Sequence, residues 1–143
     1  MQPADPHTAL LRARTIAILG AHPERARAAS YVPEYLHQQG YTVLPVNPRY
    51  AGTRLWGRRV VPRLTDLRVP VDIVDVFRRS AALASHLDEI RSMSPPPGVV
   101  WLQLGIHDDA FVEALASHGI PTISNRCTLA DHGRFGIGRV GPQ

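Results

Sequence analysis

The chain is poor in several features, and each shortage excludes a class of protein. It holds one cysteine, Cys127, which excludes an intramolecular disulfide and a cysteine-rich zinc site. No apolar run approaches the ~20 residues that a membrane-spanning helix requires. The first residues also lack the charged head and apolar stretch of a signal peptide. We therefore expect a cytoplasmic protein without a membrane partner.

Lysine is absent as well, so that 16 arginines carry all the basic charge and give a formal net charge of +4. Their spread along the chain fits an ordinary solvated surface, and it also fits an anionic partner. Nucleic acid binding would need a continuous basic face with aromatic platforms or a helix-turn-helix, and neither is evident. We therefore expect no nucleic acid partner and favour a small ligand that carries phosphate.

Five short apolar runs, mostly β-branched, alternate with segments of helical period. The runs are Thr15–Gly20, Thr42–Val46, Val71–Phe77, Val99–Leu104 and Ile120–Ser124. Such runs are typical of strands that are buried on both faces of a parallel sheet. The pattern predicts a Rossmann-like three-layer α/β/α fold, with a five-stranded parallel sheet in the order 3-2-1-4-5.

Helices are expected between these strands. The first follows Ser30, as N-cap, and ends at Gly40; the second starts at Ser80, and the third spans 108–119. The stretch 50–70 is expected to be irregular, with a short strand or a turn around Arg58 to Val61 as the one candidate element.

The length of 143 residues suits one domain. We expect it to span 14–132, after a flexible segment at 1–13 and before a flexible glycine-rich tail at 133–143.

Polar, glycine-bearing or proline-bearing residues follow the predicted strands. In an open parallel sheet, ligands bind at the carboxyl ends of the strands, so these tips should converge on one rim. The candidate residues at the tips are Gly20, Ala21, His22, Pro23, Asn47, Pro48, Arg49, Phe77, Arg78, Gln103, Gly105, Asn125 and Cys127.

The first tip predicts a phosphate site. Gly20 permits a phosphate to approach the backbone, and the next helix offers unpaired N–H groups at its positive end. Arg27 and the Ser30 hydroxyl are candidates to supplement these amides. The fingerprint G-x-G-x-x-G is absent, so a simple strand end at Gly20 remains the alternative.

The residues of the second tip distinguish between possible nucleotide ligands. An NAD site expects Asp or Glu here for the ribose diol, whereas this chain has Asn47, Pro48 and Arg49. A cation suits the phosphorylated ribose of NADP or coenzyme A. An Asn-Pro turn without a ligand remains the alternative.

Taken together, the tips resemble the small stand-alone CoA-binding proteins and, more distantly, the CoA-binding domain of the succinyl-CoA synthetase α-subunit. The resemblance runs from about Thr15 to His132. Its motifs are Gly20-Ala-His-Pro23, Gly40-Tyr41, Pro45-Val-Asn-Pro-Arg49, Asp72-Ile-Val-Asp-Val-Phe-Arg78, Trp101-Leu-Gln-Leu-Gly105 and Asn125-Arg-Cys127.

The resemblance implies a position for each part of coenzyme A. Residues 20–23 would contact phosphate, and residues 47–49 would hold the adenosine end with its 3′-phosphate. Phe77 and Arg78 would flank the adenine or the pyrophosphate. The pantetheine arm would run toward the remaining tip residues, which are Gln103, Gly105, Asn125 and Cys127.

We expect binding of coenzyme A or a short acyl ester without catalysis. The synthetase relatives use a phosphorylated histidine in a second domain and a partner subunit, and this chain is too short to contain either. Two alternatives stay open: an NADP-binding oxidoreductase-like domain, and an interaction subunit with a vestigial nucleotide site. A protein partner or a homo-oligomer also stays open.

Metal and thiol chemistry are the remaining questions. No His-Glu-x-x-His pattern occurs, so we expect no metal. Cys127 follows the fifth strand and is predicted to lie near the thiol of coenzyme A, with which it could form a mixed disulfide on mild oxidation. An inert half-buried thiol is the alternative.

Overall fold

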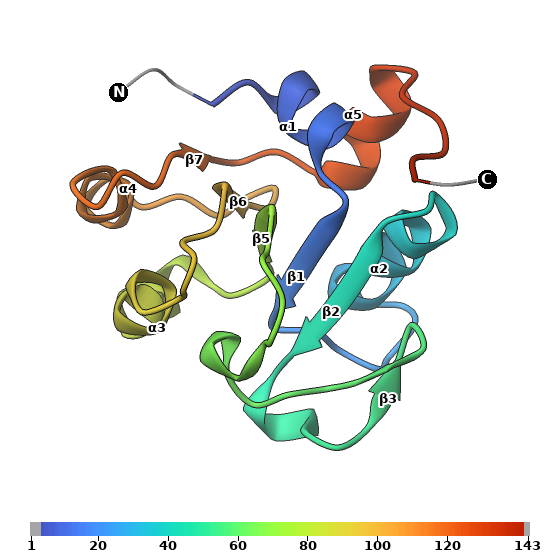
Figure 1. Cartoon of the computed structure of the whole chain (residues 1–143), viewed down its shortest axis with the longest axis horizontal. Helices are drawn as coiled ribbons and strands as arrows, with labels where there is room; N and C mark the ends of the chain where they lie inside the picture. The colour runs from blue at the N-terminus through green and yellow to red at the C-terminus, as the bar shows by residue number, and fades with distance from the viewer. Residues whose placement is uncertain (1–3, 142–143) are drawn as a thin grey trace.

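Five strands form one parallel sheet in the computed structural model, which describes residues 4–141 (Figure 1). Each predicted apolar run contains one of them. The strands are β1 (Thr15–Leu19), β2 (Thr42–Val46), β5 (Ile73–Val76), β6 (Val99–Leu102) and β7 (Thr122–Ile123). A separate antiparallel hairpin, β3 (Arg54–Leu55) and β4 (Arg58–Arg59), lies in the stretch predicted to be irregular.

The strand order differs from the prediction. The sheet runs β2-β1-β5-β6-β7, so its third strand lies beside the first, and the order is 2-1-3-4-5 rather than 3-2-1-4-5. The outer edge of β2 is occupied instead by Val61, which accepts a hydrogen bond from the Asn47 N–H at 2.9 Å. Pro45 within β2 has no N–H to donate, which suits a strand near the edge. By contrast β5 is buried along its whole length and needs neighbours on both sides.

Helices cover both faces of the sheet, which confirms the three-layer architecture. In β1, Ile16 and Ile18 join the apolar cluster on one face, while Ala17 and Leu19 join the cluster on the other. The first face is covered by α1 (Pro6–Arg12), α2 (Ala28–Gln38) and α5 (Thr128–Arg134). The second is covered by the 3₁₀-helix η3 (Ser80–His86) and by α3 (Leu87–Arg91) and α4 (Asp109–Ala116).

Helix α2 begins earlier than predicted. Arg27 is its N-cap and makes no side-chain cap, whereas Ser30 is buried in the first turn, so the prediction of Ser30 as N-cap is wrong. Pro33 lies inside the helix and cannot donate to the carbonyl of Ala29. That carbonyl accepts the His22 N–H at 3.3 Å instead. The proline thus leaves an acceptor that holds the loop after β1 against α2.

The other two helices follow the predictions more closely. The segment from Ser80 is 3₁₀ before it becomes α3, and its Leu83 and Ile90 are buried in the core. For α4, the Asp108 carboxylate accepts the Phe111 N–H at 3.1 Å, as an N-cap does.

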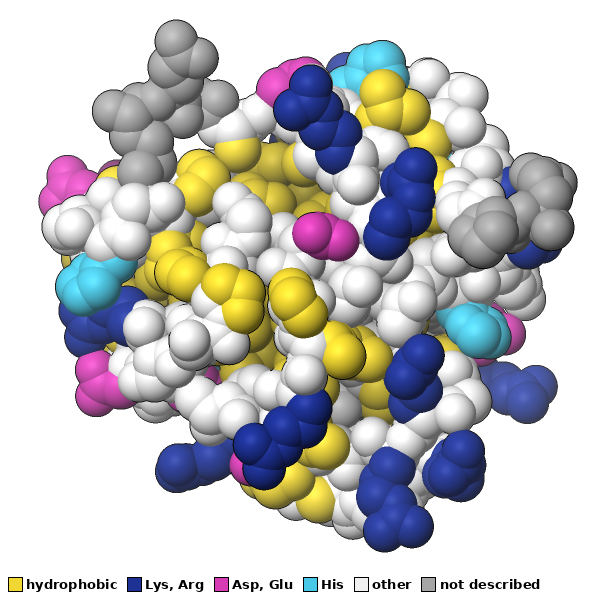
Figure 2. Space-filling view, viewed as in Figure 1, with side chains coloured by type: hydrophobic (Ala, Val, Ile, Leu, Met, Phe, Trp, Pro, Cys, Tyr) yellow, Lys and Arg dark blue, Asp and Glu magenta, His cyan; other side chains and the backbone are white. Residues whose placement is uncertain are grey.

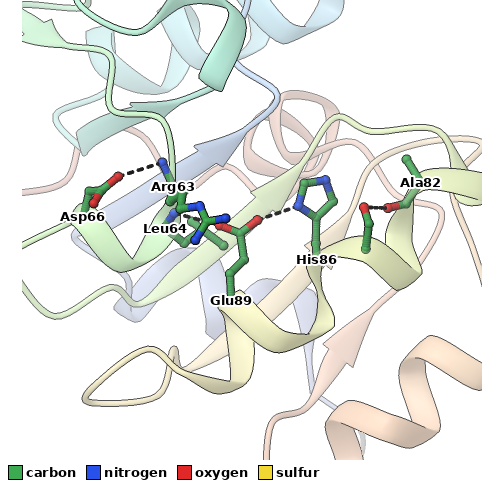
Figure 3. Close-up of polar contacts among 7 residues, drawn as sticks. Arg63, Leu64, Asp66, Ala82, His86 and Glu89 are labelled. Carbon is green, nitrogen blue, oxygen red and sulfur yellow. Dashed lines mark hydrogen bonds and ion pairs between the residues drawn. The ribbon is translucent and has the colours of Figure 1, made fainter.

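The long connection from β2 to β5 is fixed by a carboxylate on α3 (Figure 3). It contains two 3₁₀ turns, η1 (Pro48–Tyr50) and η2 (Leu64–Asp66). Glu89 accepts the Leu64 N–H at 3.0 Å and pairs with His86 Nδ1 at 2.5 Å. Burial opposes ionisation of Glu89, but these contacts outweigh it and hold its pKa below the usual value.

Both chain ends differ from the flexible segments that we predicted. Helix α1 buries Leu10, whose carbonyl accepts the Tyr41 hydroxyl. At the other end Val140 is buried, and its N–H donates to the Gln39 carbonyl at 2.7 Å. Apolar contacts of single residues therefore fix segments that composition alone marks as loose. The predictions for residues 1–3 and 142–143 lie outside the described residues.

Candidate functional site

Four of the five strand tips line one cavity of about 770 Å³. It lies at the carboxyl ends of β2, β1, β5 and β6. The connection that follows β1 leaves toward the α2 face of the sheet, and the one that follows β5 leaves toward the α3 face. Such a divergence creates the crevice in which ligands of parallel sheets bind. The corrected strand order thus places the crevice between β1 and β5.

Ten of the fifteen candidate residues line this cavity. They are Gly20, His22, Arg27, Asn47, Pro48, Arg49, Phe77, Arg78, Gln103 and Gly105. They come from four separate parts of the chain, and the shared direction of parallel strands brings them together.

The other five candidates lie outside the lining. Ala21 is fully buried, and Pro23 and Ser30 border a separate hollow between α2 and the hairpin. Asn125 does not line the cavity but supports a residue that does, because its Oδ1 accepts the Gly105 N–H at 2.7 Å. Cys127 is half-buried and packs against the apolar cluster on the α2 face, so the structure does not bring it into this cavity.

The backbone amides of the first tip are already engaged. The N–H groups of Gly20 and Ala21 donate to the Val46 carbonyl at 2.9 and 3.2 Å. Gly20 has φ +94°, and a Cβ there would lie 2.8 Å from the Phe77 carbonyl oxygen. Glycine is therefore required by the close approach of the β1 and β5 ends, and the N–H groups of Gly20 and Ala21 are not free to bind a phosphate.

Free amides lie instead at the start of α2. Ala28 and Ala29 line the cavity, and among the described residues their N–H groups have no hydrogen-bond partner. Unpaired N–H groups at a helix N-terminus, together with the helix dipole, favour an anion. Neither residue was predicted, because both precede Ser30, a better capping residue than Arg27 and the expected start of the helix.

Arginines dominate the charge of the cavity. Arg27, Arg49, Arg78 and Arg79 line it, and no lining residue is Asp or Glu. Arg27 pairs with Glu24 at 2.9 Å on the exposed rim. The other three form no ion pair within the part of the chain that the structure describes. In Figure 2, arginine side chains gather along the lower part of the molecule, toward which β1 and β2 point in Figure 1.

A histidine and a tyrosine form a fixed pair in the lining. His22 Nδ1 accepts the Glu24 N–H at 3.0 Å, so the ring proton of the neutral imidazole is on Nε2. Nε2 lies 3.0 Å from the Tyr50 hydroxyl oxygen and donates to it. The Tyr50 proton is then free to point at a ligand. Sequence reasoning missed Tyr50, which follows the candidate tip by one residue.

Asn47 has a supporting role at the second tip. Its Nδ2 donates to the Ala21 carbonyl at 2.9 Å, and its Oδ1 accepts the Arg49 N–H at 3.0 Å. The side chain joins the tips of β1 and β2 and sets the turn that carries Arg49.

The end of the cavity at β6 is neutral. Leu104 is 71% exposed, and Ile106 and Phe77 also line the cavity. Gln103 lies beneath them and donates to Asp75, a fully buried acid. Burial raises the pKa of Asp75 to about 7, although hydrogen bonds from Gln103 and Thr128 oppose the shift. The cavity therefore has a cationic end and a neutral end.

Residues 4–141 contain no cluster of three or more His, Cys, Asp or Glu side chains arranged to hold a metal ion. None of the helices in this range is both long enough and apolar enough to cross a membrane.

Comparisons with known proteins agree with this geometry. An uncharacterized protein of Bacillus subtilis, YneT, is 30% identical over 86% of this chain and 88% of its own length. A Thermus thermophilus structure, cell-free ID.343, is 47% identical with a TM-score of 0.88, over 92% of this chain and 99% of its own. A hypothetical protein of Pyrococcus horikoshii is 27% identical with a TM-score of 0.83, over 94% and 96%. The model of the CoA binding domain family matches residues 14–133, and the chain therefore belongs to that family.

Proposed function

We propose that the cavity binds coenzyme A or a short acyl ester of it and performs no chemistry on the ligand. One observation carries this proposal: four guanidinium groups and the free amides at the start of α2 line a cavity without a carboxylate, whose other end is neutral. Coenzyme A has the same division, since its phosphates are at one end and its pantetheine arm at the other. Membership of the CoA binding domain family supports the same ligand.

The phosphates are assigned to the cationic end. The N–H groups of Ala28 and Ala29 suit the pyrophosphate, with Arg78 and Arg79 beside it. Arg49 lies on the turn after β2, where the ribose of a nucleotide is held in folds of this type, and it suits the 3′-phosphate. The pantetheine arm then extends along Gln103, Leu104 and Ile106.

The absence of catalysis is part of the proposal and rests on the polar side chains in the lining. A general base needs a nitrogen or oxygen free to take a proton from the ligand. Both ring nitrogens of His22 are engaged, by the Glu24 N–H and by Tyr50. Asp75, the acid nearest the β6 end, is fully buried and accepts a hydrogen bond from Gln103, so it is not exposed to a ligand in the cavity.

Calorimetry with three ligands tests the proposal. We expect coenzyme A to bind, dephospho-coenzyme A to bind about tenfold more weakly, and NADP to bind more weakly than coenzyme A. Tighter binding of NADP would favour the oxidoreductase-like alternative. If none of the three binds, the proposal is wrong and the interaction subunit becomes the better hypothesis.

The variant Arg49→Ala locates the 3′-phosphate. It should lower the affinity for coenzyme A about tenfold and leave that for dephospho-coenzyme A unchanged. Arg12→Ala is a matched control, because Arg12 lies on α1 among residues outside this cavity. An equal loss of affinity for both ligands would show that Arg49 does not contact the 3′-phosphate.

A further inference from the structure

Three side chains form a closed hydrogen-bonded group beneath the cavity. Asp75 on β5, Gln103 after β6 and Thr128 at the start of α5 make up this group, which we term the floor cluster. Gln103 Nε2 donates to Asp75 Oδ1 at 2.6 Å and to Thr128 Oγ1 at 2.8 Å. The Thr128 hydroxyl in turn donates to Asp75 Oδ2 at 2.9 Å. All three residues are buried.

The donor count fixes the orientation of the glutamine amide. A side-chain amide has two N–H donors on one side and an acceptor oxygen on the other. Both donors of Gln103 are used within the floor cluster. While Asp75 is ionised, as it is above its pKa of about 7, exchanging the nitrogen and the oxygen would set the amide oxygen against a carboxylate that only accepts hydrogen bonds, and the contact between Gln103 and Asp75 would be lost.

The amide oxygen of Gln103 is the one side-chain polar atom of the floor cluster that takes no part in its hydrogen bonds. Among the described residues, Gln103 Oε1 has no hydrogen-bond partner, yet it is not among their buried unpartnered polar atoms. Gln103 is a lining residue of the cavity, so a ligand in the cavity is a candidate partner for this atom. Asp75 and Thr128 therefore fix the orientation of an acceptor, Gln103 Oε1, in a residue that lines the cavity.

We infer that Gln103 Oε1 accepts a hydrogen bond from an amide N–H of the pantetheine arm, and that Asp75 and Thr128 are positioning residues that hold it there. The inference rests on the proposed function, because it takes the arm to lie over the β6 end. An acceptor there recognises a donor, and the two amides are the N–H groups of the arm. Ligands with only acceptor groups in the arm are disfavoured, since both N–H donors of the Gln103 amide are held by Thr128 and the ionised Asp75.

The test compares two ligands on the same variants by calorimetry. Coenzyme A contains the arm, and 3′-phosphoadenosine 5′-phosphate keeps the adenosine and 3′-phosphate without it. We expect Gln103→Leu to lower the affinity for coenzyme A about tenfold and to leave the affinity for the nucleotide fragment unchanged. Gln38→Leu is the matched control, because Gln38 is exposed on α2 outside this cavity.

Thr128 tests the positioning role. Thr128→Val keeps the shape of the side chain and removes its hydroxyl, so Gln103 loses one of the two contacts that orient it. We expect about a fivefold loss of affinity for coenzyme A, none for the fragment, and recovery with Thr128→Ser. A merely structural role would not change the ratio between the two ligands.

A coenzyme A analogue with esters in place of both amides tests the donor without changing the protein. The wild-type chain should bind it about tenfold more weakly than coenzyme A, and Gln103→Leu should bind both alike. Equal binding of analogue and coenzyme A by the wild type would overturn the inference while the proposed function stands. Equal losses of coenzyme A and fragment in Gln103→Leu would overturn it too. If the wild type binds neither coenzyme A nor the fragment, the proposed function itself fails.

Discussion

Two polar clusters, one buried and the other partly buried, pack against the same sheet and differ in their hydrogen bonding. The floor cluster leaves one amide oxygen open to the cavity. The second, which we term the tail cluster, consists of Tyr35, His132 and the Gly138 carbonyl. His132 Nδ1 lies 2.7 Å from the Tyr35 hydroxyl, and Nε2 lies 2.8 Å from the Gly138 oxygen, so both ring nitrogens have partners. A cluster with every polar atom satisfied supports the fold, whereas one with an atom left over points to a ligand.

The clusters also differ in the sign of their response to pH. Burial raises the pKa of Asp75 in the floor cluster to about 7, because a carboxylate loses its hydration there. Burial lowers the pKa of His132 in the tail cluster, because the imidazolium is the form that loses hydration, although the Gly138 carbonyl opposes the shift. Burial therefore favours the neutral form of each group, and Asp75 ionises in the folded state only above about pH 7.

The largest expected effect is the pH dependence that Asp75 imposes on stability. The folded pKa of about 7 lies above the reference value of 3.8, so the folded state keeps a proton that the unfolded state has released. The contribution of protonated Asp75 to the free energy of unfolding is complete below pH 4 and is lost as the pH rises to 7. The free energy of unfolding falls by up to ~1.4 kcal/mol per pH unit in this range.

Urea denaturation of the wild type and of Asp75→Asn between pH 4 and pH 8 measures this effect. The variant cannot ionise, so the difference between the two unfolding free energies should grow in its favour as the pH rises. A difference that stays constant across the range would show that Asp75 does not titrate there.

The second largest effect is expected from His132→Leu. The substitution leaves the Tyr35 hydroxyl and the Gly138 carbonyl without their partner, and it should lower the free energy of unfolding by about 3 kcal/mol. The affinity for coenzyme A should not change, because His132 lies outside the cavity lining. His118→Leu, at an exposed position on the surface, is the control and should change stability by less than about 0.5 kcal/mol. Loss of ligand affinity in His132→Leu would break the distinction between the clusters.

Neither cluster was predicted, and the reason is physical. The three residues of the floor cluster are separated by up to 53 positions in the sequence, and they meet only because β5 lies beside β6. No local pattern marks such a contact. The strand tips were predictable, by contrast, because parallel strands end at one edge whatever their order.

The errors in the fold have local causes. The order 3-2-1-4-5 extends the sheet beyond β2, and the Pro45 in that strand already argues for an edge. Ser30 was expected to cap α2 by its residue type, and the turn at Arg27 decides the start instead. The fold class and four of the five tips followed from apolar runs and chain direction, which do not depend on these details.

A smaller effect is expected from the tail cluster on acidification. The pKa of His132 is lowered in the folded state, so the unfolded state binds a proton first as the pH falls below about 6.5. Stability from this group is complete above that pH and decreases as the pH falls below it, opposite in sign to the Asp75 effect. Denaturation of His132→Gln over the same range should lack this decrease relative to the wild type. An identical decrease in the variant would assign it to another group.

The smallest effect is expected from Tyr35→Phe, which removes one hydroxyl and keeps the aromatic ring. The ring packs edge-on against His132 with centroids 5.3 Å apart, so apolar packing is retained while His132 Nδ1 loses its donor. We expect a loss of about 1 kcal/mol in the free energy of unfolding and unchanged affinity for coenzyme A. Tyr31→Phe, at an exposed position on the same helix, should be neutral by comparison. Equal stability of Tyr35→Phe and the wild type would mean that the hydroxyl adds nothing to the tail cluster, and that His132 stabilises the chain end through Gly138 alone.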